Sequence, residues 1–137
     1  MKVLRLWLPS VVWMIVIFFF SSKEHVHVSE EQVINLFFFK TLHVLEYAIL
    51  FLLNIRGLSL YKAKGDKNKK LILAAVITII YALTDEIHQF FVPTREGRLR
   101  DVIIDGIGVT LAWIFLIKVL PNTPKKLRAW GKRLLKS

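Results

Sequence analysis

Long apolar segments alternate with short basic segments along the chain. A helix needs about 20 mostly apolar residues to cross the hydrocarbon core of a bilayer. Four segments meet this requirement, at residues 4–20, 33–53, 71–91 and 102–120. The second and third contain ionisable residues, but apolar residues surround these at helical spacing. The pattern predicts an all-α integral membrane bundle of four transmembrane helices.

The composition agrees with this pattern. The chain is 55% hydrophobic, with a mean hydropathy of +0.51, yet it carries a formal net charge of +10. The basic residues flank the apolar segments and no nucleic-acid-binding motif accompanies them, so we expect no nucleic-acid partner. The chain has no cysteine, which excludes a disulfide framework, a thiolate metal site and a cysteine nucleophile.

The distribution of basic residues predicts the orientation of the bundle. Lysine and arginine are concentrated before the first segment, between the second and third, and after the fourth. Because loops rich in these residues stay in the cytoplasm, both termini should be cytoplasmic. The first segment could be a signal peptide, but no small-residue cleavage site follows it. We therefore expect a retained helix, kinked or capped by Pro9.

The last residues form a separate basic segment. We divide the chain into a transmembrane domain at residues 1–120 and a cytoplasmic tail at 121–137. In the tail, Leu127, Trp130, Leu134 and Leu135 recur at helical spacing between basic residues. One interpretation is a short amphipathic helix on the inner leaflet of the membrane. The alternative is a disordered tail that only enforces topology.

The predicted spans contain ionisable residues, although the insertion free energy of a charged side chain at the bilayer centre is unfavourable by about 2.5–3.5 kcal/mol. Here they form one stripe on each of three helices, so we expect the stripes to meet inside the bundle. Counting along the helices places most of them in the outer half of the membrane. The predicted intramembrane site consists of Lys40, His43, Glu46, Tyr47, Asp85, Glu86, His88, Gln89, Asp101 and Asp105; Tyr81 lies on the same stripe as Asp85.

Three arginines precede or open the last span, at Arg95, Arg98 and Arg100. Most lysines and arginines lie on the predicted cytoplasmic side, whereas these three lie on the predicted outer side. One interpretation is an anion-binding rim, since guanidinium groups match phosphate and carboxylate geometry. The alternative is neutralisation of nearby acids. The predicted intramembrane site also has an alternative interpretation, in which its residues only hold the helices together. In that case Lys40 would pair with Asp85 or Asp105 on a neighbouring helix.

Several motifs resemble those of the VanZ-like family. The acidic-glutamine signature of that family falls on Asp85, Glu86 and Gln89, and its Pro-x-Arg on Pro93 and Arg95. The family's acidic-then-glycine segment falls on Asp101, Asp105 and Gly108, and two further runs resemble the family, from His43 to Leu50 and Phe19-Phe20-Ser21-Ser22. Thr94 stands where the family often has glycine, and Asp105 where asparagine is common. The resemblance covers about residues 5–120 and implies a multi-pass protein of the bacterial cell membrane.

The resemblance and the stripes together lead to three functional hypotheses. The first is a protein that binds or acts on membrane lipids, in particular an anionic envelope lipid or wall precursor, and is linked to teicoplanin tolerance. The second is an intramembrane acid–base enzyme that uses His88 with Asp85, or His43 with Glu46. The third and least supported is an ion or proton transporter. We predict no cofactor, and neither a nucleophile nor a complete metal set is evident. His25 and His27 are a weak candidate pair for a metal, but two histidines at this spacing are more often ordinary loop residues.

Overall fold

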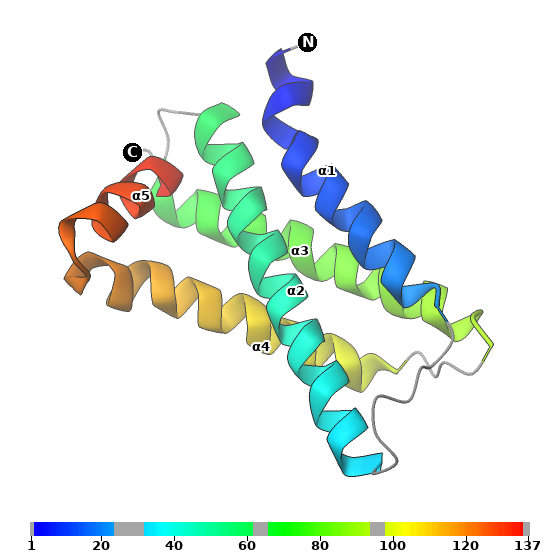
Figure 1. The fold of residues 1–137 in the computed structure, drawn as a ribbon. Coiled ribbons are helices and arrows are strands. Elements are labelled where there is room, and N and C mark those ends of the chain that lie inside the picture. Colours follow the sequence, from blue (N-terminus) through cyan, green and yellow to red (C-terminus); the bar gives the residue numbers. More distant parts are fainter. Residues whose placement is uncertain (1, 24–31, 62–65, 94–97, 136–137) are drawn as a thin grey trace.

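The computed structural model describes residues 2–23, 32–61, 66–93 and 98–135, and all its regular elements are helical. The described residues form four long helices and a shorter one at the C-terminal end (Figure 1). The long helices are α1 (Lys2–Ser21), α2 (Gln32–Tyr61), α3 (Lys67–Phe90) and α4 (Leu99–Ile114). The last of these continues through a π-helical turn η1 (Phe115–Val119) and a 3-10 turn η2 (Leu120–Asn122), before α5 (Lys125–Leu135).

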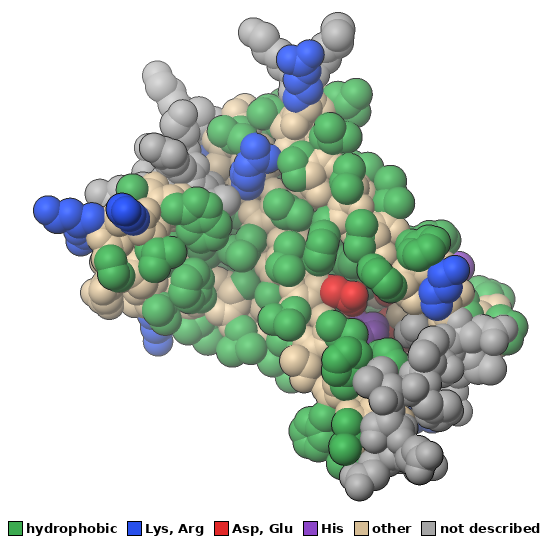
Figure 2. Space-filling model, viewed as in Figure 1, with side chains coloured by type: hydrophobic (Ala, Val, Ile, Leu, Met, Phe, Trp, Pro, Cys, Tyr) green, Lys and Arg blue, Asp and Glu red, His purple; other side chains and the backbone are tan. Residues whose placement is uncertain are grey.

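Within the part of the chain that the structure describes, four helices are long and apolar enough to cross a membrane, which confirms the predicted fold class. Figure 2 shows hydrophobic side chains covering most of one face, with lysine and arginine mainly toward its periphery. A surface of this kind suits contact with acyl chains rather than water. Which ends of the helices lie in the cytoplasm stays a prediction.

The second helix lies at the centre of the bundle. It packs against α1, α3 and α4, and its contact with α4 is the most extensive (Figure 1). The fully buried side chains of Tyr47, Leu50, Phe51 and Ile55 form its inner face. Phe51 also stacks on Trp113 of α4, with ring centroids 6.0 Å apart. A single central helix therefore carries most of the packing that holds the bundle together.

The crossing of α2 and α4 depends on a glycine. An added Cβ at Gly108 would overlap the carbonyl oxygen of Val44, so only a residue without a side chain fits there. By contrast, an added Cβ at Gly106 would lie 3.7 Å from Ile79 Cδ1, which is ordinary van der Waals contact. Close backbone approach through small residues is typical of membrane helix pairs.

The observed helix ends differ from the predicted ones, and two of them, the end of α2 and the start of α3, have a local explanation. α2 continues past residue 53 to Tyr61, because Asn54 is buried and its side-chain amide donates to Thr78 Oγ1 at 3.0 Å. The polar residues that end the apolar run in the sequence are thus accommodated inside the bundle. α3 begins at Lys67, where the side chain of Asp66 caps the backbone N–H of Asn68 at 2.9 Å. Pro9 lies inside α1 rather than at its end, so it does not cap that helix.

The basic tail forms the helix α5, which folds back onto the end of α2 and onto η2 (Figure 1). Gly131 lies against Leu120, while Leu127 and Trp130 remain 49% and 45% exposed. Of the two interpretations of the tail, the helix is the one that this arrangement supports for residues 125–135. Its position on the inner leaflet stays a prediction.

Candidate functional site

A buried carboxylate joins three helices at one end of the bundle. Asp85 of α3 is only 3% exposed. Its Oδ1 accepts a hydrogen bond from Ser21 Oγ of α1 at 2.6 Å, and its Oδ2 accepts from Tyr47 OH of α2 at 3.2 Å. Gln89, one helical turn later on α3, donates its Nε2–H to Oδ2 at 3.0 Å. Asp85 is therefore the centre of a satisfied polar network.

A second cluster joins α2, α3 and α4. His43 Nδ1 lies 3.1 Å from Asp105 Oδ1. Glu86 completes the cluster, because one ligand atom from each of these three side chains lies within 4.8 Å of the other two. The Oε2 atom of Glu86 accepts the backbone N–H of Arg98 at 3.0 Å. Glu86 Oε1 and Asp105 Oδ2 are buried and have no hydrogen-bond partner among the described residues.

The structure does not bring Lys40 into an ion pair with either aspartate. Among the described residues, Asp85 is held by neutral donors and Asp105 by His43. The Lys40–Asp85 and Lys40–Asp105 pairs considered above were therefore wrong. His43 lies one turn further along α2, where the close crossing with α4 brings its ring to Asp105.

The first helix contributes more than an apolar anchor. Besides Ser21, it places Ser22 Oγ 3.0 Å from His88 Nε2, and the ring of Phe18 lies 4.3 Å from the His88 ring. Sequence reasoning left these serines out of the predicted site. Ser21 and Ser22 belong to the Phe-Phe-Ser-Ser motif, which was the one sign in the sequence that they have a role. Helical periodicity could not show that they bond to α3, because they follow the apolar run and lie outside its pattern.

The remaining predicted residues lie around the two clusters. Glu46 is half-buried and its backbone carbonyl accepts the Trp13 Nε1–H at 2.9 Å. Asp101 is half-buried in the first turn of α4, next to the exposed Arg98 and Arg100. Arg95, His25 and His27 lie outside the described residues.

A hydrogen bond across the bundle gives one testable contribution to stability. Tyr81 OH of α3 donates to the backbone carbonyl of Met14 in α1 at 2.6 Å. We expect Tyr81→Phe to lower the free energy of unfolding by about 0.6 kcal/mol, the average for polar contacts between membrane helices. Reversible unfolding of the purified protein in mixed detergent micelles measures this. Tyr61→Phe is the control, because Tyr61 is exposed at the end of α2; equal losses in the two variants would contradict the assignment.

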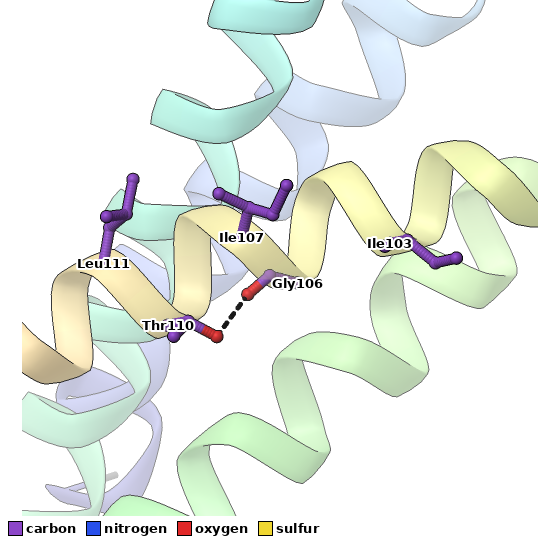
Figure 3. A pocket seen from close by; sticks show the side chains of 5 residues that line it. All are labelled: Ile103, Gly106, Ile107, Thr110 and Leu111. Atoms are coloured by element: carbon purple, nitrogen blue, oxygen red, sulfur yellow. Dashed lines mark hydrogen bonds between the residues drawn. The ribbon is translucent and has the colours of Figure 1, made fainter.

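A shallow groove of about 400 Å³ lies on α4 (Figure 3). Its lining consists of Ile103, Gly106, Ile107, Thr110 and Leu111. Thr110 donates its hydroxyl hydrogen to the Gly106 carbonyl at 2.8 Å, which leaves the groove almost wholly apolar. Asp105 is fully buried inside the bundle, so the groove lies on the outer surface of α4 and is separate from the polar clusters.

Comparison with known families decides the classification. A model of the VanZ/LLP1 family matches residues 6–120, which include both polar clusters and nearly all of the four long helices. The chain belongs to the VanZ/LLP1 family. The resemblance seen in the sequence motifs is thereby confirmed. Comparisons with curated proteins and with solved structures gave no match for this VanZ/LLP1 chain.

Proposed function

We propose that this VanZ/LLP1 family member is a bacterial membrane protein that binds the head group of an anionic envelope lipid or lipid-linked wall precursor. The observation that carries the proposal is that two of the buried, unpartnered acceptor atoms, Glu86 Oε1 and Asp105 Oδ2, belong to carboxylates of one cluster. Buried polar groups normally have hydrogen-bond partners, so acceptors left open inside a bundle suggest a ligand that donates to them.

The chemistry of the region matches such a head group. Arg98 and Arg100 are exposed around the start of α4, and the backbone N–H of Arg98 already contacts Glu86. A guanidinium group suits the phosphate of a lipid, and carboxylate oxygens suit the hydroxyl or amine hydrogens of the attached sugar, peptide or alcohol. A phosphate at the arginines would therefore place its neutral or cationic substituents near the acceptors.

Access from the side of the bundle supports a lipid ligand. His43 remains 19% exposed although its partner Asp105 is fully buried. Figure 2 shows acidic and histidine side chains reaching the surface at one place on an otherwise hydrophobic face. A polar patch bordered by apolar side chains suits a molecule whose tail stays in the bilayer while its head group contacts the bundle.

Mass spectrometry of lipids that copurify with the protein tests the proposal. We expect the wild type to retain a phosphorylated envelope lipid above its share of the membrane. Arg100→Gln should reduce the retained amount by about tenfold, because a hydrogen bond to a charged group contributes about 1.5–3 kcal/mol. Arg128→Gln is the charge-matched control, since Arg128 is exposed on α5.

The same variants provide a test in cells. If the family name reflects a role in teicoplanin tolerance, a strain with Arg100→Gln at normal protein abundance should be as sensitive as a deletion strain. The Arg128→Gln strain should match the wild type. Retention of only bulk lipids, or equal retention by Arg100→Gln and wild type, would contradict the proposal.

The His43–Asp105 pair also favours an acid–base enzyme as a second candidate, since a histidine held by a carboxylate is a common proton-transfer group. The other histidine is less suited to activate a nucleophile. Ser22 Oγ lies 3.0 Å from His88 Nε2, but it also donates to the Phe18 carbonyl at 2.6 Å, which competes with His88 for the hydroxyl hydrogen. Turnover of a labelled envelope lipid by the purified protein, lost in His43→Gln, would favour catalysis over binding alone.

A further inference from the structure

We infer that His43, Glu86 and Asp105 form a binding site for a divalent transition-metal cation, for which Zn²⁺ and Mn²⁺ are the suitable ions. Each residue comes from a different helix, and their ligand atoms lie within 4.8 Å of one another. The sequence did not predict this set, because the three residues are separated along the chain and come together only through the packing of α2, α3 and α4.

The burial and the incomplete hydrogen bonding of the Asp105 and Glu86 carboxylates point to a bound cation. Asp105 is fully buried and Glu86 is 5% exposed. Each has one oxygen without a hydrogen-bond partner in the described part of the chain. Burying a carboxylate is unfavourable unless it is paired or coordinates a metal. His43 can supply at most one positive charge for the two, whereas a divalent cation balances both.

The donor set selects among cations. Imidazole nitrogen suits Zn²⁺ and other transition metals, and carboxylate oxygen suits Mn²⁺ as well as Mg²⁺ and Ca²⁺. One nitrogen with two carboxylates therefore favours Zn²⁺ or Mn²⁺ over Mg²⁺ or Ca²⁺. The His43 Nδ1 to Asp105 Oδ1 distance of 3.1 Å also fits two ligands on one ion. Bonds of about 2.0–2.1 Å with that separation subtend roughly 100° at the metal.

The surroundings hold the ligands in place. The backbone N–H of Arg98 binds Glu86 Oε2, which fixes the carboxylate and leaves Oε1 facing the interior. Such contacts to the ligands orient a metal site. Binding would replace the hydrogen between His43 and Asp105 with the ion, since a ligating nitrogen must be unprotonated. Three protein ligands leave a coordination position for water or a phosphate oxygen. In the metal-bound protein the two carboxylates would be ligands rather than open acceptors, so a lipid would meet the ion through its phosphate; cation binding itself does not depend on the proposed lipid.

Metal titration of the purified full-length protein tests this inference. The protein is prepared in detergent without a histidine tag, stripped with chelator, and titrated with Zn²⁺ or Mn²⁺ by calorimetry, with elemental analysis of the bound ion. We expect one high-affinity cation per chain. Asp105→Asn and Glu86→Gln should each weaken binding at least about tenfold. Asp101→Asn should bind like the wild type, because Asp101 lies one turn earlier on α4 and outside the cluster.

Two further comparisons make the result decisive. The double variant His25→Ala/His27→Ala must keep the site, because these residues can bind metal independently. Size-exclusion chromatography and tryptophan fluorescence verify folding, and Glu86→Gln gives the answer if Asp105→Asn does not fold. The inference is overturned if the stripped wild type binds neither ion, if folded Asp105→Asn or Glu86→Gln binds as the wild type does, or if the double histidine variant abolishes binding. The lipid measurement, made in chelator, is a separate test.

Discussion

Gly108→Ala is expected to lower the free energy of unfolding by about 3 kcal/mol, at the upper end of the usual cost of overpacking. The added methyl group would meet the carbonyl oxygen of Val44, which belongs to the backbone of α2 and cannot rotate away. The two helices would have to separate at the crossing that supports the core. Reversible unfolding in mixed micelles measures the loss, and lower thermal stability in detergent should accompany it.

Gly106→Ala is the matched control for this prediction. It lies on the same helix, and its added methyl group would only touch a terminal atom of Ile79 at 3.7 Å. Alanine also favours the helix by about 1 kcal/mol over glycine, so this variant should be neutral or slightly more stable. Equal stability of the Gly108 and Gly106 variants would show that the α2–α4 crossing tolerates a wider spacing.

Asp85→Ala is expected to destabilise the bundle by about 1.5–4 kcal/mol. It removes two contacts between helices that each contribute about 0.6–1.7 kcal/mol, and one (i, i+4) contact within α3 that contributes about 0.2–0.5 kcal/mol. Ser21, Tyr47 and Gln89 would lose their common acceptor inside the bundle. Because Ser21 and Tyr47 come from different helices, the loss should appear as weakened association of α1 and α2 with α3. Unfolding in mixed micelles gives the magnitude, and proteolysis of the α1 end reports the weakened association.

The neighbouring Thr84→Ala variant is the control, since the Thr84 hydroxyl is exposed and donates only to the Tyr81 carbonyl of its own helix. Asp85→Asn should fall between the two, because it keeps one acceptor oxygen and the shape of the side chain. A double-mutant cycle with Ser21→Ala isolates the contact between α1 and α3. If Asp85→Ala were no more destabilising than Thr84→Ala, the network would not support the bundle.

The four long helices could be predicted because the bilayer requires one property, a long apolar run, that a single sequence displays directly. Their ends were harder to predict. Asn54 lowers local hydropathy and suggested the end of a span, yet in the structure it is buried and bonded to Thr78 of another helix. Whether a polar residue ends a helix or finds a partner inside a bundle depends on the neighbouring helix, which local periodicity does not reveal.

The meeting of polar stripes could also be predicted, but not which atoms meet. Lys40 and His43 lie one turn apart on the same stripe, so the sequence could not choose between them as the partner of Asp105. The choice follows from the position of Gly108, which fixes where α4 approaches α2. Similarly, Ser21 enters the site only because α1 ends beside Asp85, a fact of tertiary packing.

The glycine crossing has a mechanical consequence for the site beside it. A helix that pivots at a fixed crossing moves little near the pivot and much at its ends. Asp105 lies about 5 Å along α4 from Gly108, whereas Leu120 lies about 18 Å away. A tilt of about 10° in response to a thinner or thicker bilayer would move Leu120 by about 3 Å and Asp105 by less than about 1 Å. The cluster of His43, Glu86 and Asp105 therefore lies close to the pivot, so a change in membrane thickness would leave the distances between its side chains nearly unchanged.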